Sequence, residues 1–535
     1  MQVNRADAAR VPAAKVSGAA WGSTLWGRWA ASTASWQSPG IDWLLAGLAT
    51  VLGGWLRWSG LSRQSLWVDE MSSFGMANNG LRQIVPTVLN FDGHPPLYIF
   101  LVHIAHFNLG MGTVDSVRAP SLVAGILTIS VVYCLARLLV GRLGAVLTSA
   151  VVILSPVIVW YSREGRMYAV TWLFVMLSFL LLVQAVRSRH AAWLVPYGLA
   201  VALSLYSDIS AVMAIVPQAA IIGWFLLRGR PSERGSWLRV AGAYAAGWIL
   251  FVPWLLVLPR QLHLLHGTFP GYEPNLASAW RLVLNLGGLE ATYASIYRIA
   301  VPTVLAVALL LFYVFAIVGC VLLGRHHRLF TATALALTLG PAVMCAAFLA
   351  VGSPGVMLPR VMGLAAFGLA LTLGGTIALA WAALRPRSGA LLAVGAAALI
   401  ALATTSLSLA AVEAHGYNGE DWRSVARLLE AKAGTYDAVI YYPYGVKIMV
   451  DAYLPPGSHW LKDGVGIWAA PHDVAEGYFA GWAAGHSRVW MIFFAAGAID
   501  MPVHDAWFRA HGFTRVSGDP AAGSGVLEYV LLAAT

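Results

Sequence analysis

Long apolar runs alternate with short polar connectors from Trp43 to Val412. Each run holds about 20 uncharged residues, enough for a helix to cross the ~30 Å hydrocarbon core of a bilayer. The pattern predicts an α-helical polytopic membrane protein with about eleven transmembrane helices. They are expected to begin near Trp43, Ala119, Leu143, Ala169, Ala191, Ile209, Val240, Ile299, Leu329, Val361 and Ala390.

Basic residues collect in alternate connectors, and excess Lys and Arg mark the cytoplasmic side of a membrane protein. The cytoplasmic hairpins are therefore expected at Arg137/Arg142, Arg187/Arg189, Arg228–Arg239, Gly324–Arg328 and Leu384–Ser388. Residues 1–40 then form a cytoplasmic tail, residues 41–412 form the transmembrane domain, and the C-terminus lies outside. For a bacterial protein this means the inner (plasma) membrane, with the remaining loops facing away from the cytoplasm.

The segment "HPPLYIFLVHIAHFNLGMG", which begins at His94, is only weakly apolar. If it crossed the bilayer, Arg137 and Arg142 would face outward, against the positive-inside rule. We therefore expect an interfacial or re-entrant helix here. Residues 61–118 become the first extracytoplasmic loop, with short helices along the membrane surface, and Arg57 is expected to anchor the preceding span at the interface.

Composition agrees with a membrane protein. The chain has 535 residues, of which 59% are hydrophobic and 11% charged, and its mean hydropathy of +0.70 excludes the water-soluble globular class. The net charge of +10 is spread over the connectors, so no nucleic-acid partner is expected. Cys134, Cys320 and Cys345 all lie in apolar segments, and no CxxC spacing indicates a disulfide framework or a zinc site.

After Val412 the pattern changes to that of a small α/β unit. "DWRSVARLLEAKA" has helical periodicity, whereas "YDAVIYYP", "RVWMIFFA" and "GVLEYVLLA" have the composition of strands. "DAWFRAHG" is expected to end a second helix. Residues 413–535 are therefore predicted to form a C-terminal extracytoplasmic α/β domain.

The charged residues of the outer loops are candidates for chemistry. They comprise Asp69 and Glu70 in "SLWVDEMSSF", Asp92 and His94 in "FDGHPPLY", Arg163, Glu164 and Arg166 in "YSREGRMYA", and Arg360 in "MLPR". Acids and guanidinium groups at one water-facing surface suit transfer of a group from a lipid-linked phosphate to a hydroxyl. A carboxylate accepts the proton of the hydroxyl, while cations stabilise the departing phosphate.

In order, "SLWVDEMSSF", "HPPLY", "YSREGRMYAV" and "LPRVMGLAAF" resemble bacterial GT-C glycosyltransferases. The resemblance is to the group that contains protein O-mannosyltransferases, aminoarabinose transferases and rhizobial lipopolysaccharide galacturonosyltransferases, which is similar to glycosyltransferase family 39. It covers roughly Trp43 to Val412 and implies the GT-C fold. It also implies a polyprenyl-phosphate sugar donor, inversion at the anomeric carbon and chemistry on the extracytoplasmic face.

The resemblance assigns roles to individual residues. Asp69 takes the place of the catalytic aspartate, Glu70 completes the pair, and Glu164 matches an acidic position of the second outer loop. His94, Arg163, Arg166 and Arg360 are the candidates for binding the donor phosphate. If a divalent metal ion is bound, Asp92 and His94 are its candidate ligands, although Gly93 and His94 replace the acid and lysine of the aminoarabinose transferases.

Other interpretations stay open. An Asp-Glu pair at the end of a span is most often a solvated helix cap, and His94 before two prolines can simply begin a helix. The alternative functions are a membrane transporter or flippase and a non-catalytic binder of lipid phosphates. The acceptor, if there is one, is a glycolipid such as lipid A or another lipopolysaccharide part, an envelope glycan or a protein, in contact with membrane lipids.

Overall fold

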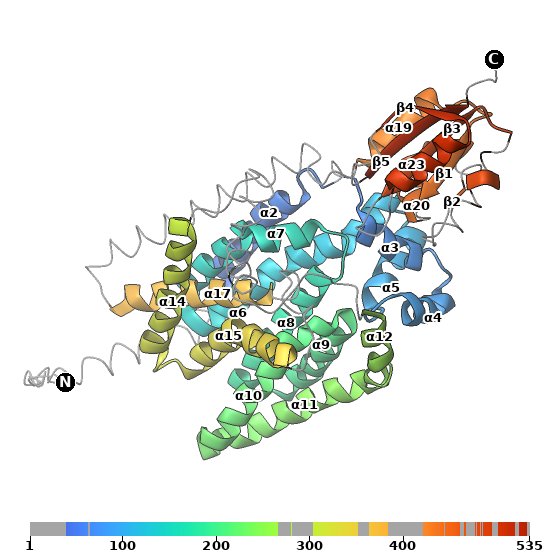
Figure 1. Cartoon of the computed structure of the whole chain (residues 1–535). Helices are drawn as coiled ribbons and strands as arrows, with labels where there is room; N and C mark the ends of the chain where they lie inside the picture. Colours follow the sequence, from blue (N-terminus) through green and yellow to red (C-terminus); the bar gives the residue numbers. More distant parts are fainter. Residues whose placement is uncertain are drawn as a thin grey trace, which may run out of the picture.

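The computed structural model describes most of the transmembrane region and much of the C-terminal domain (Figure 1). The described residues are 39–61, 65–265, 280, 303–350, 363–383, 421–442, 445–460, 465–466, 477, 479–481, 483, 485–494, 501–518 and 524–531. The expected span near Ala390, the residue Arg360 and the expected domain boundary at residue 412 lie outside them.

Helices form the bulk of the molecule, as the apolar runs predicted. Among the described residues, 7 helices are long and apolar enough to cross a membrane. These seven lie in α2 (Pro39–Trp58), α6 (Thr113–Leu154), α8 (Tyr168–Ser188), α10 (Val212–Arg228), α11 (Pro231–Leu255), α15 (Arg328–Ala350) and α17 (Leu364–Ala383). The bundle also contains α9 (Leu194–Ser207) and α14 (Thr303–Gly324), which include shorter apolar stretches.

Helix α6 lies at the centre of the bundle and contacts α2, α8 and α17. It contains two of the expected spans, joined at Gly141, where a φ of 78° breaks the helical geometry. Only glycine adopts such a backbone readily. The chain reverses there, because a Cβ at Gly53 of α2 would lie 2.3 Å from Ile129 and 3.0 Å from Ile153, which stand on opposite sides of Gly141 in the sequence. The expected hairpin at Arg137 and Arg142 is therefore present, and both arginines pair with the buried Asp42 of α2, at 3.0 and 2.9 Å.

Two sequence expectations need correction. The connector expected at Arg228–Arg239 is short, because α11 already begins at Pro231, a residue favoured in the first helical turn. The expectation for Arg57 was wrong, since its side chain is fully buried and does not extend to the interface. Its guanidinium donates to the carbonyls of Gly53 and Val152 and to the hydroxyl of Ser162.

Three short helices fill the segment that the sequence assigned to the first outer loop. They are α3 (Val68–Ala77), α4 (Leu81–Phe91) and α5 (Leu97–His103), and a turn of π-helix at Ile104–Asn108 continues α5. α5 contacts α3, α6 and α9. Figure 1 shows the three helices at the end of the bundle that faces the C-terminal domain.

The C-terminal domain contains a five-stranded mixed sheet with the strand order β2-β1-β3-β5-β4. β1 (Ala438–Tyr442) is parallel to β2 (Val465–Gly466) and β3 (Arg488–Phe494), whereas β5 (Ser524–Leu531) is antiparallel to β3 and β4 (Phe513–Ser517). Helices α19 (Trp422–Lys432) and α23 (Met501–Ala510) match the predicted helical segments, and α20 (Gly445–Asp451) was not predicted. The predicted strands correspond to β1, β3 and β5, while β2 and β4 were missed.

The C-terminal domain contacts the first outer loop just before α3, and α20 packs against α3 itself. The Leu66 N–H donates to the Tyr453 hydroxyl at 2.6 Å, and Ser65 Oγ lies 3.5 Å from an oxygen of Asp421. Asp421 is also the N-cap of α19, where it accepts from the Ser424 N–H. The domain thus holds the chain where it enters α3.

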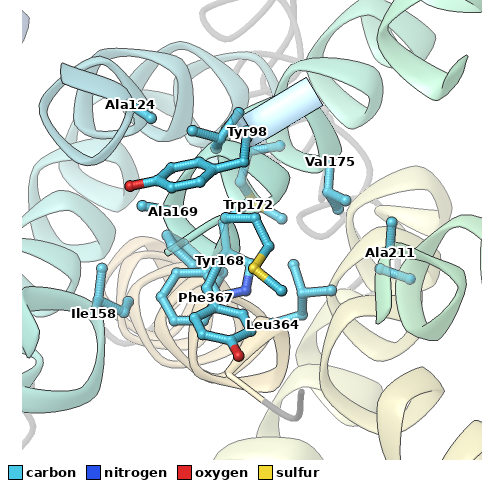
Figure 2. Close-up of a cluster of buried hydrophobic side chains, with 14 of the residues drawn as sticks. Tyr98, Ala124, Ile158, Tyr168, Ala169, Trp172, Val175, Ala211, Leu364 and Phe367 are labelled. Carbon is cyan, nitrogen blue, oxygen red and sulfur yellow. The ribbon is translucent and has the colours of Figure 1, made fainter. Parts of the chain in front are cut away.

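A cluster of aromatic side chains fills the core between α5, α7 (Pro156–Arg163), α8 and α17 (Figure 2). The Trp172 ring packs edge-on against Phe367, with centroids 5.6 Å apart, and against Tyr161 at 5.5 Å. Tyr98 is buried in the same core, and its hydroxyl donates to the Val117 carbonyl of α6 at 2.6 Å. This core fixes the helices that carry the outer loops.

Close backbone contact between α15 and α17 yields the first prediction. A Cβ at Gly368 would lie 2.4 Å from backbone atoms of Leu337 and Thr338, so Gly368→Ala has to separate the helices. We expect it to lower the stability of the purified protein by about 1–3 kcal/mol, the usual range for overpacking. Thermal unfolding in detergent measures the change. Gly223→Ala is the control, since a Cβ there meets nothing within 4 Å, and equal midpoints for both variants would contradict the prediction.

Candidate active site

Asp69 and Glu70 occupy the first turn of α3, as neighbours on a helix. Successive helical residues point about 100° apart, so the two carboxylates face different surroundings. Glu70 is buried, with an exposed fraction of 1%, whereas Asp69 is half-buried. The two acids of the motif therefore serve different purposes.

The carboxylate of Glu70 is enclosed by donors. Arg118, in the first turns of α6, binds it at two points: Nε donates to Oε1 at 2.8 Å and Nη2 donates to Oε2 at 2.7 Å. The Gly165 N–H donates to Oε1 at 2.6 Å, and the Trp67 N–H, at the start of α3, donates to Oε2 at 3.3 Å. Such a two-point pair is both strong and directional. Glu70 thus joins α3, α6 and the second outer loop, which we term the Glu70 clamp (Glu70, Arg118 and Gly165).

Gly165 is required by this arrangement. A Cβ at that position would lie 2.3 Å from Val117 Cγ1 and 2.9 Å from Glu70 Oε1. No larger residue fits between α6 and the Glu70 carboxylate without moving one of them. The glycine between Glu164 and Arg166 in "REGR" therefore lets the second outer loop approach α3.

Arg166 brings the second outer loop onto α3. Its side chain is buried, and Nη1 donates to Ser73 Oγ at 3.0 Å and to the Asp69 carbonyl at 3.3 Å. The Ser121 hydroxyl donates to the Arg166 carbonyl at 2.6 Å, which fixes the residue from α6. Among the described residues, the buried Arg166 Nε–H has no hydrogen-bond acceptor. Within this part of the chain Arg166 is thus firmly held and retains one N–H that can bind a ligand.

The charge of Arg166 is balanced by acidic groups from both outer loops. Burial lowers the pKa of the guanidinium, but the nearby Tyr168, Asp92, Asp69 and Glu164 raise it, and the net shift is upward. The half-buried carboxylates of Asp69, Asp92 and Glu164 therefore surround one cation, although they are far apart in the sequence. The structure brings together the acids that the sequence selected.

The "DGHPPLY" motif lies beside this cation. Asp92 ends α4, and its Oδ1 accepts from the His94 N–H at 3.3 Å. The His94 ring contacts two carboxylates: Nδ1 is 3.1 Å from Asp208 Oδ1, and Nε2 is 3.9 Å from Asp92 Oδ1. Both main-chain carbonyls, of Asp92 and of His94, accept from the Gln261 side chain, at 3.2 and 3.3 Å. The motif is thus fixed by α9, α12 (Leu258–Leu265) and its own turn.

A metal ion bound by Asp92 and His94 would need further ligands. Their facing atoms are 3.9 Å apart, which suits two ligands of one ion at about 2.1 Å each. Within the described part of the chain, no group of three His, Cys, Asp or Glu could hold a metal. The residues present therefore supply two ligands and do not form a complete protein site.

The remaining predicted residues lie elsewhere. Arg163 ends α7 and is buried, and its Nη2 donates to the Ser59 carbonyl beyond the end of α2, at 3.1 Å. Its role in phosphate binding stays a prediction, as does that of Arg360, which lies outside the described residues. Glu164 caps the end of α7 beside Arg166.

Arg118 and Asp208 were not among the site residues predicted from the sequence. Arg118 resembles any basic residue at the start of a span, and nothing in the sequence pairs it with Glu70. Asp208 had a usable signal, because it is the one acid in the apolar stretch "LSLYSDISAVMAIVP". Ionisable residues among apolar spans usually mark functional positions.

The Glu70 clamp yields a second prediction. Glu70→Gln leaves the buried guanidinium of Arg118 without a matching charge, and breaking a buried pair from one side costs about 3–5 kcal/mol. We expect a clear fall in the thermal unfolding midpoint in detergent. Arg488→Ala, which breaks the partly exposed pair with Glu528, is the control and should change the midpoint little. An unchanged midpoint in Glu70→Gln would show that the clamp contributes nothing to stability.

Comparison with known proteins gives a family match over part of the chain and a fold for most of it. Residues 93–257 match the family model described as dolichyl-phosphate-mannose-protein mannosyltransferase. A sequence search of curated proteins finds no match.

Among solved structures, the apo oligosaccharyltransferase of Archaeoglobus fulgidus is similar with a TM-score of 0.52 and 15% identity, covering 89% of this chain and 72% of that one. The same enzyme tethered to an acceptor peptide with the NVT sequon gives a TM-score of 0.50 and 13% identity, covering 93% and 75%. ArnT from Cupriavidus metallidurans in the apo state gives 0.48 and 12%, covering 92% and 98%. The predicted resemblance is confirmed: this chain is a multi-pass membrane protein with the GT-C fold, and residues 93–257 are similar to the dolichyl-phosphate-mannose-protein mannosyltransferases.

Proposed function

We propose that the chain is an inverting glycosyltransferase that moves a monosaccharide from a polyprenyl-phosphate donor to a hydroxyl of an envelope acceptor on the extracytoplasmic face. One observation carries the proposal. The half-buried Asp69 lies next to the buried cation Arg166. The other acid of the same helix, Glu70, is already paired with Arg118. A carboxylate that is accessible and firmly supported, beside a cation, suits a general base.

The reaction follows from this arrangement. Asp69 accepts the proton of the acceptor hydroxyl as the oxygen forms a bond to the anomeric carbon of the sugar. The bond from that carbon to the phosphate oxygen breaks, and its electron pair leaves with the polyprenyl phosphate. Attack from the face opposite the phosphate inverts the anomeric configuration. The leaving phosphodiester group needs no proton, so one base and a set of cations are sufficient.

Cations beside Asp69 are suited to hold the phosphate. Arg166 has an unused Nε–H, and His94 directs Nε2 towards Asp92 at the edge of the same cluster. Arg163 and Arg360 are further candidates from the sequence. If Asp92 and His94 hold a divalent metal, it would supply additional positive charge for the phosphate, and Glu164 would help to balance Arg166.

Proteins with similar structures give the donor and acceptor classes some support. A structure of ArnT is described as bound to undecaprenyl phosphate, and the archaeal oligosaccharyltransferase is described with a tethered acceptor peptide. The family description names a dolichyl-phosphate sugar. For this chain we propose a polyprenyl-phosphate sugar as donor and a lipopolysaccharide part, another glycan or a protein as acceptor.

Replacing the base provides the third prediction. Asp69→Asn keeps the shape of the side chain but cannot accept the proton, so turnover should fall by about 10²–10⁴-fold. The measurement is mass spectrometry of envelope glycolipids, glycans and glycoproteins from a deletion strain that carries each variant. The product absent from the deletion strain should return with the wild-type gene and not with Asp69→Asn.

Asp115→Asn is the matched control, since Asp115 is an exposed acid at the start of α6 and undergoes the same chemical change. It should restore the product fully. Full restoration by Asp69→Asn would contradict the role of Asp69 and favour a non-catalytic lipid-phosphate binder. A deletion strain with unchanged glycans, grown where the protein is expressed, would contradict the transferase itself.

The side of the membrane is the subject of the fourth prediction. Tyr436 is 90% exposed in the C-terminal domain, and Ser232 is exposed at the start of α11, so cysteines there are accessible to reagents. In spheroplasts, an impermeant thiol reagent should label Tyr436→Cys, and it should label Ser232→Cys only after the membrane is opened. Labelling at Ser232→Cys alone would reverse the proposed orientation. The wild-type chain, whose Cys320 and Cys345 are buried, measures the background.

A further inference from the structure

Asp208 is a buried acid that the proposed reaction does not use. It lies between α9 and α10, and its side chain is 2% exposed. Its neighbours in sequence are apolar spans, yet its carboxylate contacts the "HPP" turn from the first outer loop, 114 residues earlier in the chain. A carboxylate placed in so apolar a region needs partners that offset the cost of its burial.

Both oxygens of Asp208 have partners. Oδ1 is 3.1 Å from His94 Nδ1, and Oδ2 accepts from the Ser210 hydroxyl. A carboxylate accepts hydrogen bonds, so the 3.1 Å contact assigns the donor role to Nδ1 of His94.

This bond determines which atom of the His94 ring is available. With Nδ1–H committed to Asp208, Nε2 is the nitrogen that faces the acids around Arg166, 3.9 Å from Asp92. The His94 side chain remains 24% exposed, so Nε2 can meet a ligand. The main chain is held as firmly, because the Gln261 amide donates to the carbonyls on either side of Gly93 and accepts from Trp254 Nε1 at 2.9 Å.

We propose that Asp208 is a positioning residue, which holds the His94 ring with Nε2 towards the phosphate of the bound polyprenyl phosphate. The inference rests on the proposed function, which places the donor phosphate at His94. An imidazole can bridge two anionic groups through its two nitrogens, so Asp208 fixes the ring from the buried side while Nε2 meets the phosphate.

The test measures binding of undecaprenyl phosphate, the carrier lipid without a sugar, to the purified full-length protein in detergent. We expect Asp208→Asn to weaken binding by about tenfold, because an amide oxygen holds the Nδ1–H of His94 less strongly than a carboxylate does. His94→Ala should cause a similar loss, and the double variant Asp208→Asn/His94→Ala should lose no more than His94→Ala alone. This non-additivity is expected of a residue that acts through another and not of two independent contributions.

Ser207→Ala is the control, because Ser207 is buried next to Asp208 and its hydroxyl donates only to the Leu203 carbonyl in its own helix. Its affinity should equal that of the wild type. Wild-type binding with unchanged affinity in Asp208→Asn, or additive losses in the double variant, would overturn the inference. A wild type that does not bind undecaprenyl phosphate would instead contradict the proposed donor. The thermal unfolding midpoint of each variant separates loss of binding from loss of the fold. If Asp208→Asn does not fold, His94→Ala still tests whether His94 contributes to binding of undecaprenyl phosphate.

Discussion

The two-point bond between Glu70 and Arg118 is the interaction on which the candidate active site depends. It joins residues 48 positions apart, from a short helix at the surface and from the central helix α6. The same carboxylate accepts the Gly165 N–H, so the second outer loop is attached at the same point. Without it, α3 would be held mainly by contacts with α5 and with the C-terminal domain. A buried charge pair of this kind also fixes one arrangement, since any shift leaves an unpaired charge in an apolar environment.

The two adjacent acids of the motif thus have different roles. The Glu70 carboxylate accepts hydrogen bonds that hold neighbouring segments together, while Asp69, one residue earlier, stays half-buried beside Arg166. The helical angle between neighbours makes this possible, because one side chain can point into the protein while the other points towards the solvent-facing side. Arg166 is likewise held at two points, because its carbonyl accepts a hydrogen bond from α6 and its guanidinium donates one to α3. The result is a half-buried acid and a buried cation on a rigid support, which is the general requirement for a preorganised site.

Sequence patterns predicted the helices and the outer-loop acids for a physical reason. Hydrophobic length and the distribution of basic residues determine which segments cross the membrane and which loops share a side, and the loops with Asp69, Asp92 and Glu164 do gather around Arg166. The partners of individual side chains depend on packing between distant segments. Arg118 and Asp208 therefore could not be matched to Glu70 and His94 from one sequence, and nothing in the sequence paired Arg137 with the buried Asp42 of α2. The strand β2, with only two residues, is too short to leave a pattern.

The contact between the C-terminal domain and the entry to α3 also has a consequence for biogenesis. The Leu66 N–H is bonded to Tyr453, 387 residues later, and Ser65 lies against Asp421. At a synthesis rate of about 5–20 residues per second, roughly 20–80 s separate the appearance of Leu66 from that of Tyr453. During that interval the Glu70 clamp can form, since Arg118 and Gly165 emerge early, but the residues before α3 still lack their final partners. A segment that is synthesised late therefore completes the support of the entry to α3.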